Sequence, residues 1–150
     1  MTREERCQLA IKRGFSYDAE TGDIFNRYGK KSKPNKSNGY HEICITVNKK
    51  SFKIQGHQFA WYYEYRDCVA ELDHINGLRH DNRICNLRPV THQQNSWNRV
   101  NAKGYYMIKG RDRYRAEIKL NNKKIYLGFY KTEQEARKAY LQAKEIYHKI

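Results

Sequence analysis

The chain has 150 residues and carries 30 Lys and Arg against 16 Asp and Glu, a net charge of +14. This much positive charge on one or two small domains favours a polyanionic partner, and an aromatic content of 13% excludes a disordered basic tail. No stretch approaches the roughly 20 apolar residues of a membrane helix, and the N-terminus lacks an apolar signal core, so we expect a cytoplasmic protein without a membrane partner.

The first third of the chain predicts one helix and two pairs of short strands. Residues 1–14 are charged and predict a helix that ends at Gly14. The strand segments are rich in β-branched and aromatic residues between turn residues, and they are 15–18, 23–27, 40–47 and 52–54. The last two alternate in polarity around Asn48-Lys49-Lys50, which predicts a β-hairpin.

Two features of this region leave alternatives open. The loop over residues 29–39 contains four lysines among Ser, Pro and Asn, and it is either a solvated linker or a basic loop that follows a DNA backbone. After the hairpin, Gly56-His57 starts an apolar helix. We favour a structural role for His57 over a catalytic one, because it stands alone near a helix start.

Residues 71–99 are the most informative stretch, because Asp73 and His74 stand side by side at the end of a predicted strand. Residues 75–77 turn the chain, a polar loop follows, and a second short strand runs through residues 87–90. Thr91 is placed to cap a helix over residues 92–99. A strand, loop, strand and helix of this size must dock on other elements to be stable.

Residues 100–150 predict a second module of three strands and a helix. They carry 13 Lys and Arg and 5 Asp and Glu, so 13 minus 5 gives a net charge of +8. The first strand is 105–108, and Asn121-Asn122 forms the tight turn between the second and third. A capping box over residues 132–135 opens the helix, which is expected to pack these residues on the sheet: Ala136, Ala139, Tyr140, Ala143 and Tyr147.

The strands of this module alternate between a core face and a basic face. The residues expected to face the core are Tyr114, Ala116, Ile118, Leu120, Ile125, Leu127 and Phe129. The residues expected on the basic face are Arg113, Arg115, Glu117, Lys119, Lys124 and Tyr126.

Asp73, His74 and Asn95 supply the groups that phosphodiester hydrolysis needs. A histidine can act as a base near neutral pH, and carboxylate and amide oxygens suit Mg²⁺. The same residues would also suit a polar turn whose asparagines satisfy the backbone. None of the four cysteines forms a C-x-x-C pair, so we expect no structural zinc and prefer free thiols to two disulfides.

A family resemblance sharpens this hypothesis. Residues 72–77, with Asp81-Asn82-Arg83, Asn86-Leu87-Arg88, Val90-Thr91 and Gln94-Asn95, resemble the HNH (ββα-metal) endonucleases, and most closely the phage and intron-associated homing type. The likeness extends upstream to residues 17–22, 38–40 and 57–61, so it covers residues 15–99.

The resemblance implies a role for each site residue. Asp73 and Asn95 would bind Mg²⁺ or another divalent cation such as Mn²⁺, and His74 would be the general base. Asn86 would brace the loop and orient that histidine. Many members have histidine at the position of Asn95, which leaves His92, one helical turn earlier, as a rival ligand.

Residues 103–147 resemble the AP2 DNA-binding domain, a family that lays a three-stranded sheet in the major groove. The matching segments are 116–118, 126–130 and 132–140. The resemblance places the following residues on or beside the DNA face: Arg111, Arg113, Arg115, Lys119, Lys124 and Tyr126. Tyr126 stands where plant members often carry tryptophan.

We therefore expect an α+β protein, with an HNH endonuclease domain and its β-rich support over residues 1–99 and an AP2-like domain over residues 100–150. The predicted function is metal-dependent cleavage of double-stranded DNA, by homing-type nicking or double-strand cutting, as a monomer or homodimer in a bacterial or phage-infected cell. No small-molecule cofactor is expected. The alternative is a catalytically inactive DNA-binding regulator. An RNA-binding protein is disfavoured, because no stretch resembles an RNA-stacking module.

Overall fold

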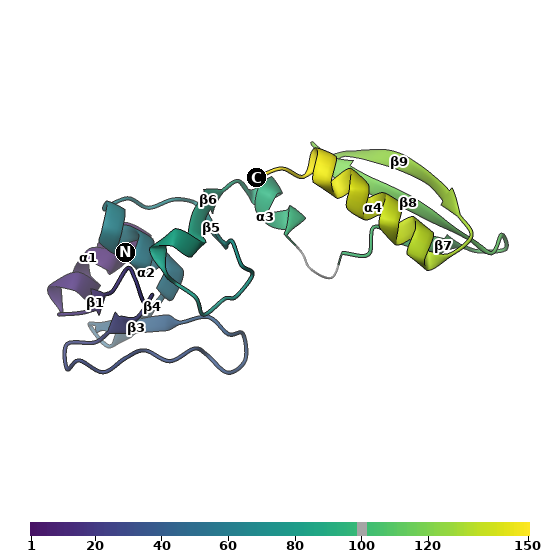
Figure 1. Cartoon of the computed structure of the whole chain (residues 1–150). Helices are drawn as coiled ribbons and strands as arrows, with labels where there is room; N and C mark the ends of the chain where they lie inside the picture. Colours follow the sequence, from purple (N-terminus) through teal and green to yellow (C-terminus); the bar gives the residue numbers. More distant parts are fainter. Residues whose placement is uncertain (99–101) are drawn as a thin grey trace. The chain divides into compact units, whose positions relative to one another are not determined.

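The computed structural model describes residues 1–98 and 102–150 and has a mixed α+β fold (Figure 1). Backbone contacts divide the chain into two compact units, Met1–Val90 and Thr91–Ile150. The predicted domain boundary between residues 99 and 100 lies outside the described residues and stays a prediction. No helix in the described part of the chain is long and apolar enough to cross a membrane.

The first unit begins with helix α1 (Arg3–Lys12). Thr2 caps it in a capping box, since its hydroxyl accepts from the Glu5 amide while the Glu5 carboxylate accepts from the Thr2 amide. The helix ends before Gly14, whose φ of +85° suits glycine. Strands β1 (Ser16–Tyr17) and β2 (Ile24–Phe25) follow as an antiparallel pair, as predicted.

The predicted hairpin of the first unit is confirmed as β3 (Glu42–Val47) and β4 (Lys50–Gln55). Asn48 and Lys49 form its turn, and both have positive φ, which matches the twist of a two-residue hairpin loop. Helix α2 (Gly56–Tyr65) starts directly after β4. These elements enclose the core of the unit, whose most buried large side chains include Ile24, Ile45 and Phe59.

Strands β5 (Glu71–His74) and β6 (Leu87–Val90) form a second antiparallel hairpin in the first unit. A long loop joins them and ends in the 3₁₀ turn η1 (Ile84–Asn86). Leu72 and Leu87 are buried, so the hairpin docks through its apolar residues, as its small size requires.

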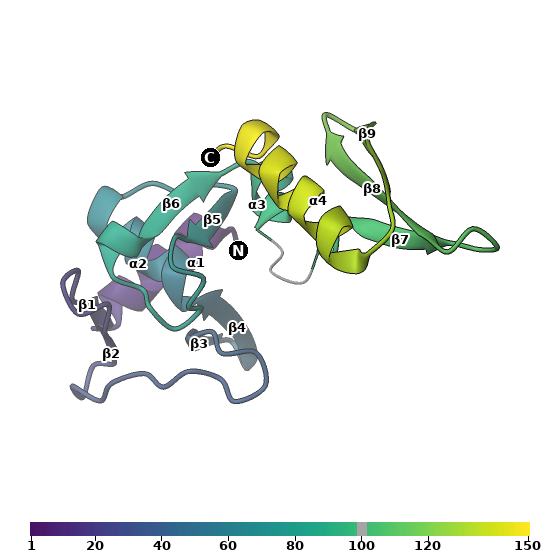
Figure 2. The same ribbon diagram turned by 45° about the vertical axis from the view of Figure 1, so that its right-hand side comes forward.

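The second unit begins with α3 (His92–Trp97), which Thr91 caps together with Gln94. Strands β7 (Tyr105–Ile108), β8 (Arg113–Leu120) and β9 (Lys123–Tyr130) form an antiparallel sheet with β8 in the centre. Helix α4 (Glu133–Tyr147) lies across one face of this sheet (Figures 1 and 2). The buried residues between helix and sheet include Ala116, Ile118, Ala136, Tyr140 and Ala143.

Two residues predicted to be in the core of the second unit are exposed. Pairing of β8 with β9 shifts between Ala116 and Glu117, and this bulge reverses the alternation of β9. Phe129 consequently pairs with Arg115 and is 43% exposed. Tyr147, the last residue of α4, is also exposed, while the next residue, His148, hydrogen-bonds the Lys119 carbonyl at the end of β8 (2.9 Å).

Gly104 allows a close approach between the start of β7 and α4. Its φ is +74°, and an added Cβ would lie 2.0 Å from Cγ of Tyr140. We expect Gly104→Ala to lower the free energy of unfolding by roughly 2–4 kcal/mol, because it adds backbone strain and a clash with a buried ring. Gly110→Ala is the matched control, since Gly110 has a similar φ of +80° and no atom within 4 Å. If chemical denaturation shows that Gly104→Ala and Gly110→Ala lower the free energy of unfolding equally, the predicted clash with Tyr140 is wrong.

Candidate functional site

Asp73 and His74 are the last two residues of β5 and both are buried. The strand ends there because residues 75–77 turn the chain, and the Gly77 amide donates to the His74 carbonyl (2.9 Å). Their cross-strand neighbours on β6 are Arg88 and Leu87. The acid and the histidine therefore stand together at the edge of the loop that joins β5 to β6.

The Asp73 carboxylate forms an ion pair across the hairpin. Its Oδ2 accepts from Nε of Arg88 at 2.9 Å and from Nη2 of the same guanidinium at 2.8 Å. The guanidinium also balances the negative charge of a carboxylate that is largely removed from solvent.

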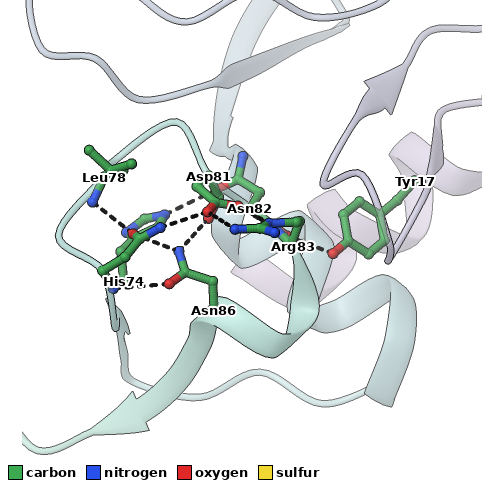
Figure 3. Close-up of polar contacts among 8 residues, drawn as sticks. Tyr17, His74, Leu78, Asp81, Asn82, Arg83 and Asn86 are labelled. Carbon is green, nitrogen blue, oxygen red and sulfur yellow. Dashed lines mark hydrogen bonds and ion pairs between the residues drawn. The ribbon is translucent and has the colours of Figure 1, made fainter.

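The His74 ring is oriented by the side chain of Asn82 (Figure 3). Nε2 of His74 lies 3.2 Å from Oδ1 of Asn82. An amide oxygen only accepts, so this contact assigns the ring hydrogen to Nε2 and leaves Nδ1 as the basic nitrogen. Burial lowers the pKa of His74, opposed by the hydrogen bond to Asn82 and by the charge of Asp73, so the imidazole is neutral at pH 7.

Asn82 is itself fixed by the β1–β2 hairpin. It is 1% exposed, and its carbonyl accepts from the Tyr17 hydroxyl at 2.6 Å (Figure 3). The turn between β1 and β2 packs against the same backbone, since a Cβ on Gly22 would lie 2.5 Å from the Arg83 amide nitrogen. The Ile84 amide also donates to the Ala19 carbonyl (3.2 Å). Elements far away in the sequence thus determine where Asn82 meets His74.

Asn86 closes the loop from the other end. Its Oδ1 accepts from the Asn76 amide (3.0 Å), and its Nδ2 donates to Oδ1 of Asn76 (3.0 Å) and to the Asp81 carbonyl (2.8 Å). The Asn86 carbonyl accepts from the Ile75 amide (2.9 Å). These contacts brace the loop, while the side chain hydrogen-bonded to His74 belongs to Asn82. The catalytic assignment of Asn86 stays a prediction.

The sequence predicted that Asn86, and not Asn82, orients His74. Residues 72–98 contain several asparagines, and polarity alone does not say which one turns inward. One feature of the sequence could have identified Asn82 as the buried residue. It lies between Asp81 and Arg83, which can form an ion pair with each other. Asp81 and Arg83 form an ion pair at the surface, and the hydrogen bonds of this pair lower the pKa of Asp81 to about 2. Asn82, between them, is buried.

Two further rings pack against His74. The ring centroid of His57 lies 5.3 Å from that of His74, and the Tyr40 centroid lies 6.0 Å from it. His57 is only 6% exposed, and its structural role stays a prediction. Burial and the neighbouring His74 lower the pKa of His57 to about 4. His74, the base predicted from the sequence, therefore packs against two aromatic rings. The sequence did not indicate these contacts.

The candidate metal ligands fall in different units. Asp73 belongs to the first unit, while Asn95 and His92 belong to α3 in the second. The pairing of Asp73 with Asn95 or with His92 therefore stays a prediction. Within residues 1–98 and 102–150, no group of three or more His, Cys, Asp or Glu side chains is arranged to hold a metal ion.

The basic face of the second unit includes an acidic residue, Glu117, which pairs with two of its basic residues. Glu117 Oε1 lies 3.0 Å from Nζ of Lys124, and Glu117 Oε2 lies 3.5 Å from Nε of Arg115. The Arg115 guanidinium also lies over the Tyr126 ring, 4.9 Å from its centroid. Arg111, Arg113 and Lys119 are exposed, and the predicted contacts of all these residues with DNA stay predictions.

The buried His57 should make stability depend on pH. Its pKa in the folded chain, about 4, lies below its usual value of 6.5, so the unfolded chain binds the proton first as pH falls. The free energy of unfolding should drop between pH 6.5 and 4, by on the order of 3 kcal/mol from this residue. When the free energy of unfolding is measured by denaturation at a series of pH values, it should fall less steeply with decreasing pH in His57→Phe than in the wild type. His80→Phe, which changes an exposed histidine, should keep the wild-type profile, and a parallel profile for His57→Phe would contradict the assignment.

Comparison with known proteins found similarity to one solved structure, titled "DNA binding and cleavage by the HNH homing endonuclease I-HmuI". The identity is 25%, the TM-score is 0.45, and the match covers 57% of this chain and 51% of that one. This chain therefore matches about half the length of that protein. No protein-family model and no curated protein sequence matches the chain.

Proposed function

We propose that the protein is a metal-dependent DNA endonuclease of the HNH (ββα-metal) type. The observation that carries this proposal is the buried His74 at the end of β5, whose Nε2 lies 3.2 Å from Oδ1 of Asn82 and so leaves Nδ1 as the basic nitrogen. The residues of the 72–95 motif and the net charge of +14 support it.

Asp73 with Asn95 would hold Mg²⁺ or Mn²⁺, and His92 is the rival to Asn95. The donor set fits a hard cation, because it offers carboxylate and amide oxygens and Mg²⁺ retains several waters of its own. A bound cation would stabilise the charge that develops on the phosphate and on the 3′ leaving oxygen.

In this proposal His74 Nδ1 takes a proton from the attacking water. The hydroxide forms the new bond to phosphorus, the bond from phosphorus to the 3′ oxygen breaks, and that oxygen takes a proton from solvent. The Nε2–H group keeps its hydrogen bond to Asn82, which stabilises the imidazolium as it forms. Asn86 keeps the loop closed and so preserves the spacing between His74 and Asn82.

The second unit would supply affinity for double-stranded DNA. Residues 100–150 carry a net charge of +8, and five of the six predicted DNA-binding residues lie on β8 or β9, with Arg111 in the preceding turn. Contacts from this face to phosphates position the module, and contacts to base edges give sequence bias.

One observation favours the alternative of an inactive DNA-binding regulator. The Asp73 carboxylate is already paired with a cation, since Arg88 lies 2.8 Å away. A guanidinium in this position competes electrostatically with a metal ion. Metal-dependent cleavage by the wild type decides between the two functions.

Nicking of supercoiled plasmid in Mg²⁺ tests the enzyme. We expect the wild type to nick the plasmid and His74→Ala to be slower by about 100-fold or more, because the proton acceptor is removed. His80→Ala, an exposed histidine in the same loop, should cut like the wild type. A wild type that binds but never cuts supports the regulator, while cutting by His74→Ala at the wild-type rate contradicts only the base assignment.

Salt dependence tests the basic face. We expect Glu117→Gln to release Arg115 and Lys124 for phosphates, so that DNA binding tightens and the plot of log affinity against log salt becomes steeper by about 0.9 per added contact. Glu145→Gln makes the same charge change on the exposed side of α4 and should leave the slope unchanged. Equal slopes for the two variants would show that Glu117 does not keep Arg115 and Lys124 from contacting phosphates.

A further inference from the structure

The bulge in β9 places an aromatic ring on the basic face of the sheet. Phe129 pairs in register with Arg115, so its side chain leaves the core side that α4 covers. Its ring meets the Tyr126 ring edge to face, with centroids 5.3 Å apart. Both rings are about half exposed. The two rings therefore form a small apolar patch on an otherwise charged face.

Phe129 also lines a pocket. This pocket has a volume of about 300 Å³, and its other lining residues are Arg111 and Arg113. Both arginines are exposed, and within residues 1–98 and 102–150 neither forms an ion pair with an acidic side chain. Tyr126 has Arg115 against its ring, so Phe129 is the member of the aromatic pair that opens on the pocket.

The side chains that line the pocket favour the edges of DNA bases as ligands. Guanidinium groups donate to O6 and N7 of guanine, the commonest specific contact in the major groove. An aromatic carbon edge offers no hydrogen bond, but it makes a favourable apolar contact with the C5-methyl group of thymine. A pocket with both features fits neighbouring guanine and thymine edges better than it fits a run of phosphates, which would use the arginines alone.

We propose that the Arg111–Arg113–Phe129 pocket is a base-reading site, in which Phe129 contacts the C5-methyl of a thymine next to a guanine bound by the arginines. This inference rests on the proposed binding of double-stranded DNA by the second unit. It adds Phe129 as a specificity-determining residue of the face. The predicted contacts of Arg111 and Arg113 become base contacts, while Lys119 and Lys124 remain suited to phosphates.

The test uses the full chain and a duplex selected from a random pool by repeated binding. Each thymine of the selected duplex is then replaced by deoxyuridine, which removes the methyl group and keeps the base pair. We expect one replacement beside a guanine to weaken wild-type binding by about three- to tenfold, a size typical of one buried methyl contact. Phe129→Ala should bind the thymine and deoxyuridine duplexes equally, and Phe129→Leu should retain part of the discrimination.

Leu141→Ala is the matched control, because Leu141 is as exposed as Phe129 but lies on α4. It should discriminate like the wild type, and the circular dichroism of all variants should match. A selected site without thymine, or discrimination that survives in Phe129→Ala, overturns the inference. Failure to bind any duplex overturns it together with the DNA-binding role of the unit. Plasmid left intact by a wild type that still discriminates overturns the nuclease proposal alone.

Discussion

The contact between Asn82 and His74 is the interaction on which the proposed chemistry depends. An imidazole can act as a base through one nitrogen only when the other is held in its protonated form. Asn82 does this from inside the protein, and its own position is fixed by the Tyr17 hydroxyl and by the tight turn at Gly22. The short β1–β2 hairpin therefore acts on the site through Asn82.

Asp73 and His74 are adjacent in the chain but have different surroundings. His74 is buried under His57 and Tyr40, which favours its neutral form. Asp73 faces Arg88 across the hairpin, and its Oδ2 lies 2.8 Å from Nη2 of that guanidinium. One strand end thus presents a neutral base beside a carboxylate, a separation of roles typical of sites that combine proton transfer with charge stabilisation.

Local sequence patterns predicted most of the fold, because they depend on neighbouring residues alone. The hairpin turns at Asn48-Lys49 and Asn121-Asn122 and the cap at Thr132 belong to this group. The identity of the residue on His74 was not predictable in this way, since Asn82 is placed by packing against residues 17–22. The exposure of Phe129 also escaped prediction, because alternation along β9 gives no sign of a bulge.

The position of the proton on the neutral His74 ring tests most directly whether Asn82 orients this histidine as a base. A long-range ¹H–¹⁵N correlation spectrum of the full chain near neutral pH distinguishes the two neutral tautomers, with His74→Gln used to assign the signal. We expect a proton on Nε2 in the wild type and the loss of this preference in Asn82→Ala. A proton on Nδ1 in the wild type, or a tautomer ratio unaffected by Asn82→Ala, would contradict it.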